Sequence, residues 1–363
     1  MVSTNATVVE PVSWELARRV AVQALRLAPV LEDDTRRSFT VDIDEAALRA
    51  QSLVEATTGL VSLAGPPNAV VVDRLGWVDA NIASFRRLLN PLAAKLAERP
   101  RLMPAISSPA GAAVSGAEVG LVLAWLSSRV LGQYDLFAGE EDGRDAVYFV
   151  APNIMAIERR HAFPPQEFRL WIAIHELTHR AQFTGVLWMR EYFLGLVERG
   201  TTLTPPDGRT IMNGLLQAVE EMRSGRNPLA DGGIVSLLAS ADQLATLHEA
   251  QALMSLLEGH SDVVMSSAAT AEIPGAKRFA RVLSDRRTST KGLAKLLQQF
   301  IGIDAKLRQY EEGEHFVEAV QAEGGDELLA KVWSRQEFLP TLEEIREPSG
   351  WIARAAGATS QLS

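Results

Sequence analysis

Two histidines and a glutamate occur within five residues of this chain, in the run His175-Glu176-Leu177-Thr178-His179. On a helix, residues i and i+4 lie on one face, so His175 and His179 can bind one metal ion together. Glu176 then lies beside the ion, where its carboxylate can take a proton from a water molecule. The spacing predicts a metal-dependent hydrolytic site, and zinc is the metal that this motif favours.

The residues before this run indicate that it lies on a buried helix. Pro164 and Pro165 end the preceding segment, and the residues that follow are apolar on most faces. Two imidazoles and a carboxylate at the end of such a helix would be costly to bury without a partner such as a metal ion. The alternative is an ordinary amphipathic helix that carries two partly exposed histidines.

A third metal ligand has to come from elsewhere, because catalytic zinc has three protein ligands and one open position for water. The chain has no cysteine, so the ligand must be a nitrogen or oxygen donor, and His248, His260, His315 and the downstream carboxylates are candidates. Glu258 and Asp262 lie four residues apart in a stretch with helical apolar spacing. Glu258 can therefore bind the metal while Asp262 accepts the free ring N–H of a ligand histidine.

Two alternatives limit this choice of third ligand. Glu258 and Asp262 can instead form a solvated helix face. His260 is two residues from Glu258 and faces nearly the opposite side of the helix, which makes it a poor co-ligand.

An HExxH run followed by an E-x-x-x-D helix resembles the gluzincin site of thermolysin-type peptidases. The resemblance implies that His175, His179 and Glu258 bind zinc. It also implies that Glu176 is the general base and that Asp262 accepts a hydrogen bond from a ligand histidine without binding the metal itself. The chain departs from that family in the 78 residues from 180 to 257, which exceed its short connection, and in lacking a clear counterpart of its transition-state histidine.

Four segments also resemble a bacterial family of zincin-like hydrolases of unknown substrate, and they are residues 149–154, 175–179, 258–265 and 309–317. Some members of that family are associated with biosynthesis of a deazaflavin coenzyme. The resemblance covers most of the chain. It implies a zincin-like metal-binding core and a zinc-dependent hydrolase or metallopeptidase activity, and it leaves the substrate open.

Apolar residues at three- and four-residue spacing predict a mainly α protein of the α+β class. The expected helices are 12–28, 44–58, 76–98, 116–132, 166–184, 209–224, 239–267, 274–286 and 290–322. Residues 133–137 and 146–150 flank a polar turn and predict a small β-hairpin or sheet before the active-site helix. An exposed edge of that hairpin can pair with an extended peptide, or the hairpin can simply cover the core.

The expected domain organisation is an N-terminal helical region (1–115), a zincin-like catalytic domain (116–352) and a short polar tail (353–363), or one continuous domain. A net charge of −9 with scattered basic residues argues against nucleic acid or an anionic membrane as a partner. The N-terminus lacks the features of a secretory signal, and no apolar run is long enough for a membrane helix. We therefore expect a cytoplasmic protein, and its oligomeric state is left open.

The site predicts hydrolysis of an amide, with peptides as the first candidate substrate and small amides as the second. One zinc ion per chain would activate water and polarise the carbonyl, and Glu176 would move the proton to the leaving amine. Tyr310 and His315 are candidates for stabilising the oxyanion or contacting substrate, although either can be an ordinary helix or turn residue. The alternative from another class is a non-catalytic protein that keeps the zinc site for structure or ligand sensing.

Overall fold

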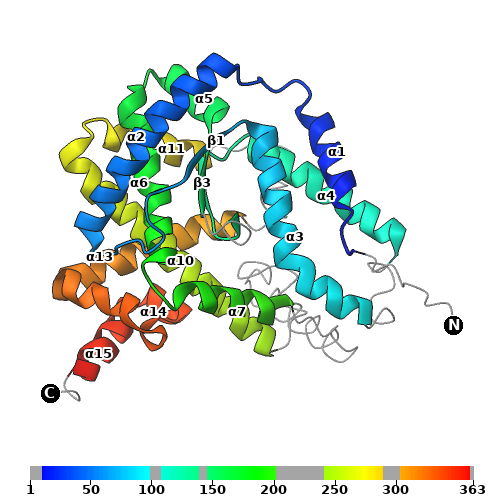
Figure 1. Cartoon of the computed structure of the whole chain (residues 1–363). Coiled ribbons are helices and arrows are strands. Elements are labelled where there is room, and N and C mark those ends of the chain that lie inside the picture. The colour runs from blue at the N-terminus through cyan, green and yellow to red at the C-terminus, as the bar shows by residue number, and fades with distance from the viewer. Residues whose placement is uncertain (1–9, 99–107, 139–144, 202–240, 289–302, 360–363) are drawn as a thin grey trace, which may run out of the picture. The chain divides into compact units, whose positions relative to one another are not determined.

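The computed structural model describes residues 10–98, 108–138, 145–201, 241–288 and 303–359. The chain divides into two compact units (Figure 1). Unit 1 contains Met1–Glu55 and Ser62–Arg180, and unit 2 contains Ala56–Val61 and Ala181–Ser363. The expected division into 1–115 and 116–352 stays a prediction.

Unit 1 is a small sheet with helices on both faces. Its helices are α1 (Trp14–Leu25), α2 (Asp33–Thr58), α3 (Arg74–Glu98), α4 (Pro109–Ser127), α5 (Ala151–His161) and α6 (Pro165–Thr184), and its strands are β1 (Ala69–Val72), β2 (Gly132–Asp135) and β3 (Ala146–Val150). The last turns of α2 and α6 belong to unit 2.

The strand order in the sheet is β1-β3-β2, with β1 parallel and β2 antiparallel to β3. Val72 lies opposite Val150, and Tyr134 lies opposite Val147. The two strands of the predicted hairpin are confirmed, and residues 139–144 between them lie outside the described residues. Strand β1 was not predicted from the sequence.

The sheet lies between α3 and α6 (Figure 1). Asn81 on α3 and Gln133 on β2 exchange two side-chain hydrogen bonds of 3.2 Å, and the Ser84 hydroxyl donates to Asp135 over 2.7 Å. Side chains alternate along a strand, so Gln133 and Asp135 face α3 while residues 132 and 134 face the opposite side. Because these contacts turn Gln133 and Asp135 toward α3, the face of β2 that carries residues 132 and 134 is turned toward α6.

Helix α4 packs closely on α1 through glycines. A Cβ atom at Gly116 would lie 2.4 Å from the Ser13 carbonyl oxygen, and one at Gly120 would lie 2.3 Å from that of Ala17. Leu123 joins Trp14 and Trp77 in a buried apolar cluster of unit 1. By length and composition alone, α4 is the one helix in the described part of the chain that is apolar enough to cross a membrane, and 33% of that segment is buried.

The secondary structure of unit 2 is all helical in its described residues, with loops between the helices. It contains α7 (Met189–Thr201), α10 (Ala241–Glu272), α11 (Ala276–Thr288), α13 (Ile303–Ser334), the short 3₁₀ helix η2 (Gln336–Phe338), α14 (Leu342–Arg346) and α15 (Pro348–Thr359). Leu256, Phe316 and Trp351 are fully buried in its core. Backbone meets backbone where α10 crosses α13, because a Cβ at Gly259 would lie 2.1 Å from the carbonyl carbon of Gly313.

The expected fold class, mainly α with a small sheet, is confirmed. Helices α2 and α4 begin earlier than expected, and the helix expected to reach residue 132 ends at Ser127, before β2 begins. Helices α5, α7, α14 and α15 were not predicted. Residues 209–224 and 290–302, expected to be helical, lie outside the described residues. Residues 353–359 belong to helix α15, and Ala355 packs in the core of unit 2.

Candidate metal centre

Helix α6 carries the two histidines of the motif on one face. The rings of His175 and His179 are 4.7 Å apart between centroids and nearly perpendicular, at 85°. Both residues are half-buried, whereas the neighbours on the other faces, such as Ile174 and Leu177, are almost fully buried. The buried faces fix the helix, and the half-buried face leaves the imidazoles accessible to an ion and to solvent.

Glu258 on α10 completes a cluster of three possible ligands. One ligand atom from each of His175, His179 and Glu258 lies within 4.8 Å of the other two. Bonds of about 2.1 Å to one tetrahedral zinc ion would place the ligand atoms about 3.4 Å apart, so small side-chain rotations suffice to close the site. Among the residues that the structure describes, this is the one group of three or more histidine or acidic side chains close enough to share an ion.

Glu176 lies against the edge of strand β2 that is turned away from β3. The backbone N–H of Tyr134 donates to Glu176 Oε2 over 3.1 Å. Val150 N–H donates to the Leu131 carbonyl, so alternation along the antiparallel ladder turns the N–H of Tyr134 away from β3 and toward α6. A hydrogen bond from a backbone N–H stabilises a carboxylate in its ionised form, which is the form that accepts a proton.

Gly132 makes this approach possible. A Cβ atom built on Gly132 would lie 2.6 Å from Glu176 Cγ and 2.7 Å from Oε1. Any side chain at this position would push Glu176 away from β2. The absence of a side chain at residue 132 therefore holds the space for the motif glutamate.

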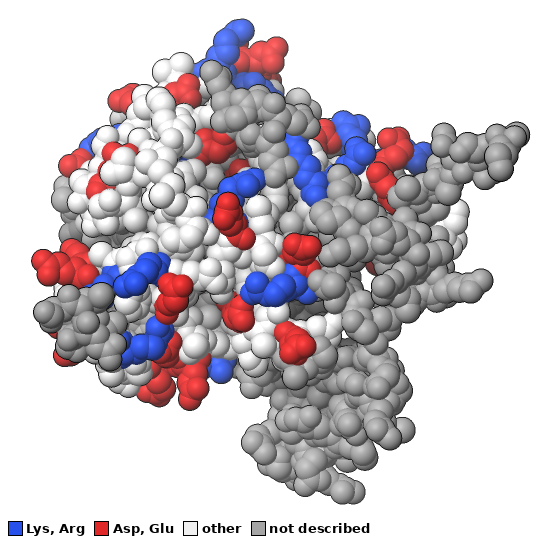
Figure 2. Space-filling view, turned by 60° about the horizontal axis from the view of Figure 1, so that its bottom comes forward, with Lys and Arg blue, Asp and Glu red and all other residues white. Residues whose placement is uncertain are grey.

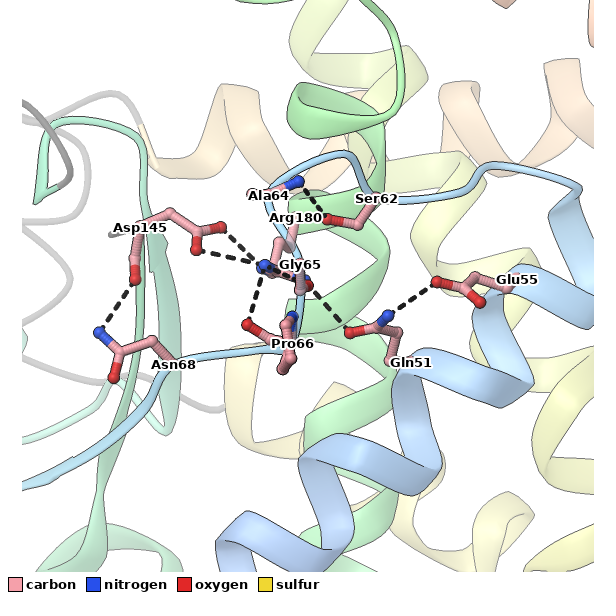
Figure 3. Close-up of polar contacts among 9 residues, drawn as sticks. All are labelled: Gln51, Glu55, Ser62, Ala64, Gly65, Pro66, Asn68, Asp145 and Arg180. Atoms are coloured by element: carbon pink, nitrogen blue, oxygen red, sulfur yellow. Dashed lines mark hydrogen bonds and ion pairs between the residues drawn. The ribbon is translucent and has the colours of Figure 1, made fainter. Parts of the chain in front are cut away.

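Arg180, the residue after His179, anchors α6 within unit 1 (Figure 3). Its side chain is fully buried and bonds Asp145 through Nε at 2.6 Å and through Nη2 at 3.3 Å. Nη1 donates to Gln51 Oε1 at 3.3 Å, and Nη2 also donates to the carbonyls of Gly65 and Pro66 at 2.9 and 3.3 Å. The guanidinium thus joins α6 to α2, to the loop before β1 and to the residue that precedes β3.

Comparison with known proteins identifies the family. Residues 12–352 match the model of the zincin-like metallopeptidases. The chain belongs to this family. A solved crystal structure from Chloroflexus aurantiacus, of a candidate hydrolase with a novel fold, is 30% identical with a TM-score of 0.69, covering 94% of this chain and 98% of the other. No curated protein is significantly similar.

The zincin-like site brings together only part of the predicted residue set. Asp262 lies one turn after Glu258 on α10 and is half-buried, and its support of a ligand stays a prediction. His315 is exposed on α13, and Tyr310 belongs to the same helix, but its side chain lies outside the described residues. His315 is not part of the three-residue cluster, and the roles of both residues stay predictions.

The other candidate ligands differ in their surroundings. His248 is exposed. His260 is 2% exposed, lies beside the Gln182 amide with 3.0 Å between Gln182 Nε2 and its Nδ1, and has its ring 4.8 Å from that of Trp333. The ring and Nδ1 of His260 therefore both have protein neighbours, and the side chain is buried, unlike the half-buried side chains of His175 and His179.

Sequence reasoning missed the groups that position the motif. Gly132, the Tyr134 N–H and Arg180 act through contacts with segments about 35 to 130 residues away in the chain. Strand β1 had a usable signal in the apolar run from Ala69 to Val72, bounded by prolines and Asp73. The other contacts leave no periodic pattern in a single sequence.

Proposed function

We propose that this protein is a zinc-dependent hydrolase of the zincin type that cleaves amide bonds. One zinc ion per chain would be held by His175, His179 and Glu258, with Glu176 as the general base. The single observation that carries the proposal is the convergence of these three side chains beside a glutamate held by a backbone N–H. Membership of the zincin-like metallopeptidase family and the likeness to a candidate hydrolase support it.

The donor set fits zinc. Two imidazole nitrogens and one carboxylate oxygen are a frequent ligand set of catalytic zinc, which keeps a fourth position for water. All three residues are half-buried, so the fourth position has room to remain open. The same set also binds manganese, cobalt or iron, and the family supports the choice of zinc.

The proposed reaction follows from the place of Glu176. Zinc bound at this site supplies a Lewis acid that activates a water molecule and polarises the substrate carbonyl. Glu176, held by the Tyr134 N–H, takes one proton from the water, whose oxygen bonds to the carbonyl carbon. Glu176 then delivers the proton to the nitrogen as the C–N bond breaks, so the products are a carboxylic acid and an amine. Asp262 would orient a ligand histidine, and Tyr310 or His315 would stabilise the oxyanion.

A peptide is the first candidate substrate and a small amide is the second. On the edge of β2 that is turned away from β3, the backbone groups of Gly132 point away from the sheet. An extended peptide can pair with such an edge and place one of its carbonyls near the metal-binding helix. This edge supports the choice of a peptide.

Other partners are proposed from charge. On the face shown in Figure 2, acidic and basic side chains are interspersed, and the chain carries a net charge of −9. A nucleic-acid site would need a continuous basic surface. We therefore propose that the protein binds neither nucleic acid nor a membrane. We also propose a cytoplasmic location.

The test compares the wild type with Glu176→Gln, which keeps the shape of the side chain and loses the proton acceptor. Both proteins are loaded with zinc, their metal content is measured, and cleavage of a peptide library is followed by mass spectrometry. We expect equal zinc content and cleavage by the wild type alone. Equal cleavage by both would refute the role of Glu176. Zinc in both with no cleavage of peptides or small amides by the wild type would favour a non-catalytic zinc protein.

A further inference from the structure

Gln182 lies on the same face of α6 as the two motif histidines, three residues after His179. Its side chain is fully buried. The Nε2 atom donates to the Leu257 carbonyl over 3.0 Å and lies 3.0 Å from Nδ1 of His260. Leu257 and His260 stand on either side of Glu258 in the sequence of α10.

The chemistry of these contacts fixes which atom is the donor. A carbonyl oxygen only accepts, so the Gln182 atom that faces Leu257 must be the NH₂ group. The second hydrogen of the same group then points at Nδ1 of His260, which must accept it. His260 therefore carries its proton on Nε2, and one amide group holds two points of α10.

We propose that Gln182 is a positioning residue that sets Glu258 in place as the third metal ligand. This inference rests on the proposed function. A carboxylate lies about 6 Å from its helix axis, so a 10° rotation of α10 would move it by about 1 Å. Zinc–ligand bonds tolerate only about 0.2 Å. Two hydrogen bonds that bracket Glu258 restrain that rotation, which one bond could not do.

The opposite face of α10 is also restrained at this turn. A Cβ atom at Gly259 would lie 2.1 Å from the Gly313 carbonyl carbon, and one at Gly313 would lie 1.9 Å from the Ser255 carbonyl oxygen. Helix α10 is therefore held against the α13 backbone on one side and by the Gln182 amide on another. The turn that carries Glu258 has little freedom to shift along either direction.

The test is the zinc affinity of Gln182→Met, measured by competition with a chromophoric chelator. Methionine has nearly the length of glutamine and no donor. We expect affinity to fall about tenfold, the lower end of what losing an outer-shell contact costs. Trp351→Phe is the matched control, because it removes a buried side-chain bond to the Phe338 carbonyl in the same unit. It should lower the melting temperature of the metal-free protein and leave zinc affinity within about twofold of the wild type.

Two variants of His260 test the same pair of hydrogen bonds from the α10 side. His260→Asn keeps an acceptor near the position of Nδ1, and His260→Leu removes it. We expect asparagine to bind zinc more tightly than leucine, even if Gln182→Met fails to fold.

The outcomes separate the two proposals. Gln182→Met that binds zinc as tightly as the wild type, or equal affinities for the two His260 variants, overturns the positioning role alone. A wild type that binds no zinc overturns the proposed function itself. A loss of zinc affinity in Gln182→Met, together with an unchanged zinc affinity in Trp351→Phe, supports the positioning role of Gln182.

Discussion

Replacing Arg180 by methionine tests whether the buried ion pair beside the motif holds α6 in unit 1. Methionine keeps much of the apolar stem and removes the guanidinium. Asp145 would then lose its only ion-pair partner among the described residues, while its own side chain is only 13% exposed. The variant leaves a nearly buried carboxylate without a counter-charge.

The expected cost follows from this burial. Removing one partner of a buried ion pair destabilises a protein by about 3–5 kcal/mol, because the remaining charge is desolvated and unpaired. The other groups that accept hydrogen bonds from Arg180 add little to this loss of stability. Gly65 and Pro66 are exposed, so water can reach their carbonyls, and Gln51 keeps its bond to Glu55. We therefore expect Arg180→Met to lower the free energy of unfolding by about 3–5 kcal/mol.

The chain offers a matched control in the pair of Arg18 and Asp79. This pair is also bidentate, with bonds of 2.8 and 3.1 Å, but its side chains are 51% and 40% exposed. Exposed pairs contribute about 0–1 kcal/mol, so Arg18→Met should change stability little. Urea unfolding of both variants and the wild type, followed by tryptophan fluorescence, measures the difference. Equal losses in the two variants would refute the argument from burial.

Three further substitutions test contacts within the two units. Gly132→Ala should keep zinc content and reduce hydrolysis at least tenfold, because its Cβ would lie 2.6 Å from Glu176 Cγ; full activity would contradict the close approach. Gly259→Ala should lower the free energy of unfolding by about 3 kcal/mol or more in urea titration, since α13 leaves no room for a methyl group. Burial raises the pKa of Glu344, but hydrogen bonds from Arg354 and a backbone N–H outweigh it and leave the pKa below its ordinary value. Because the pKa of Glu344 is lower in the folded protein, its ionised carboxylate stabilises the fold at neutral pH, and this stabilisation is lost as the pH falls through the folded-state pKa. The wild type should therefore melt at a higher temperature than Glu344→Gln at neutral pH, and this difference should vanish in acid. A difference in melting temperature that does not change with pH would contradict the prediction.

The local part of the site could be predicted from the sequence. His175, Glu176 and His179 lie within two helical turns, so the 3.6-residue period alone places both imidazoles on one face. Glu258 could be chosen because helical spacing surrounds it and the site needed a third ligand. The structure brings its carboxylate near the two histidines.

The groups that hold the site in place could not be predicted, because their partners are distant in sequence. Nothing near Gly132 indicates that its missing side chain makes room for Glu176. Arg180 resembles any arginine after a motif until its burial against Asp145 is known. Strand β1 differs from these groups, because the apolar run from Ala69 to Val72 between prolines and Asp73 does give a usable signal.

The most direct test of the proposed metal centre is the zinc content of the purified wild type and of Glu258→Ala, measured by mass spectrometry after zinc loading and removal of unbound metal. We expect about one zinc per wild-type chain and a strongly reduced content in the variant. Equal zinc in both would show that Glu258 is not the third ligand and would return attention to His248, His260 and His315. A wild type that binds no zinc would contradict the metal centre altogether.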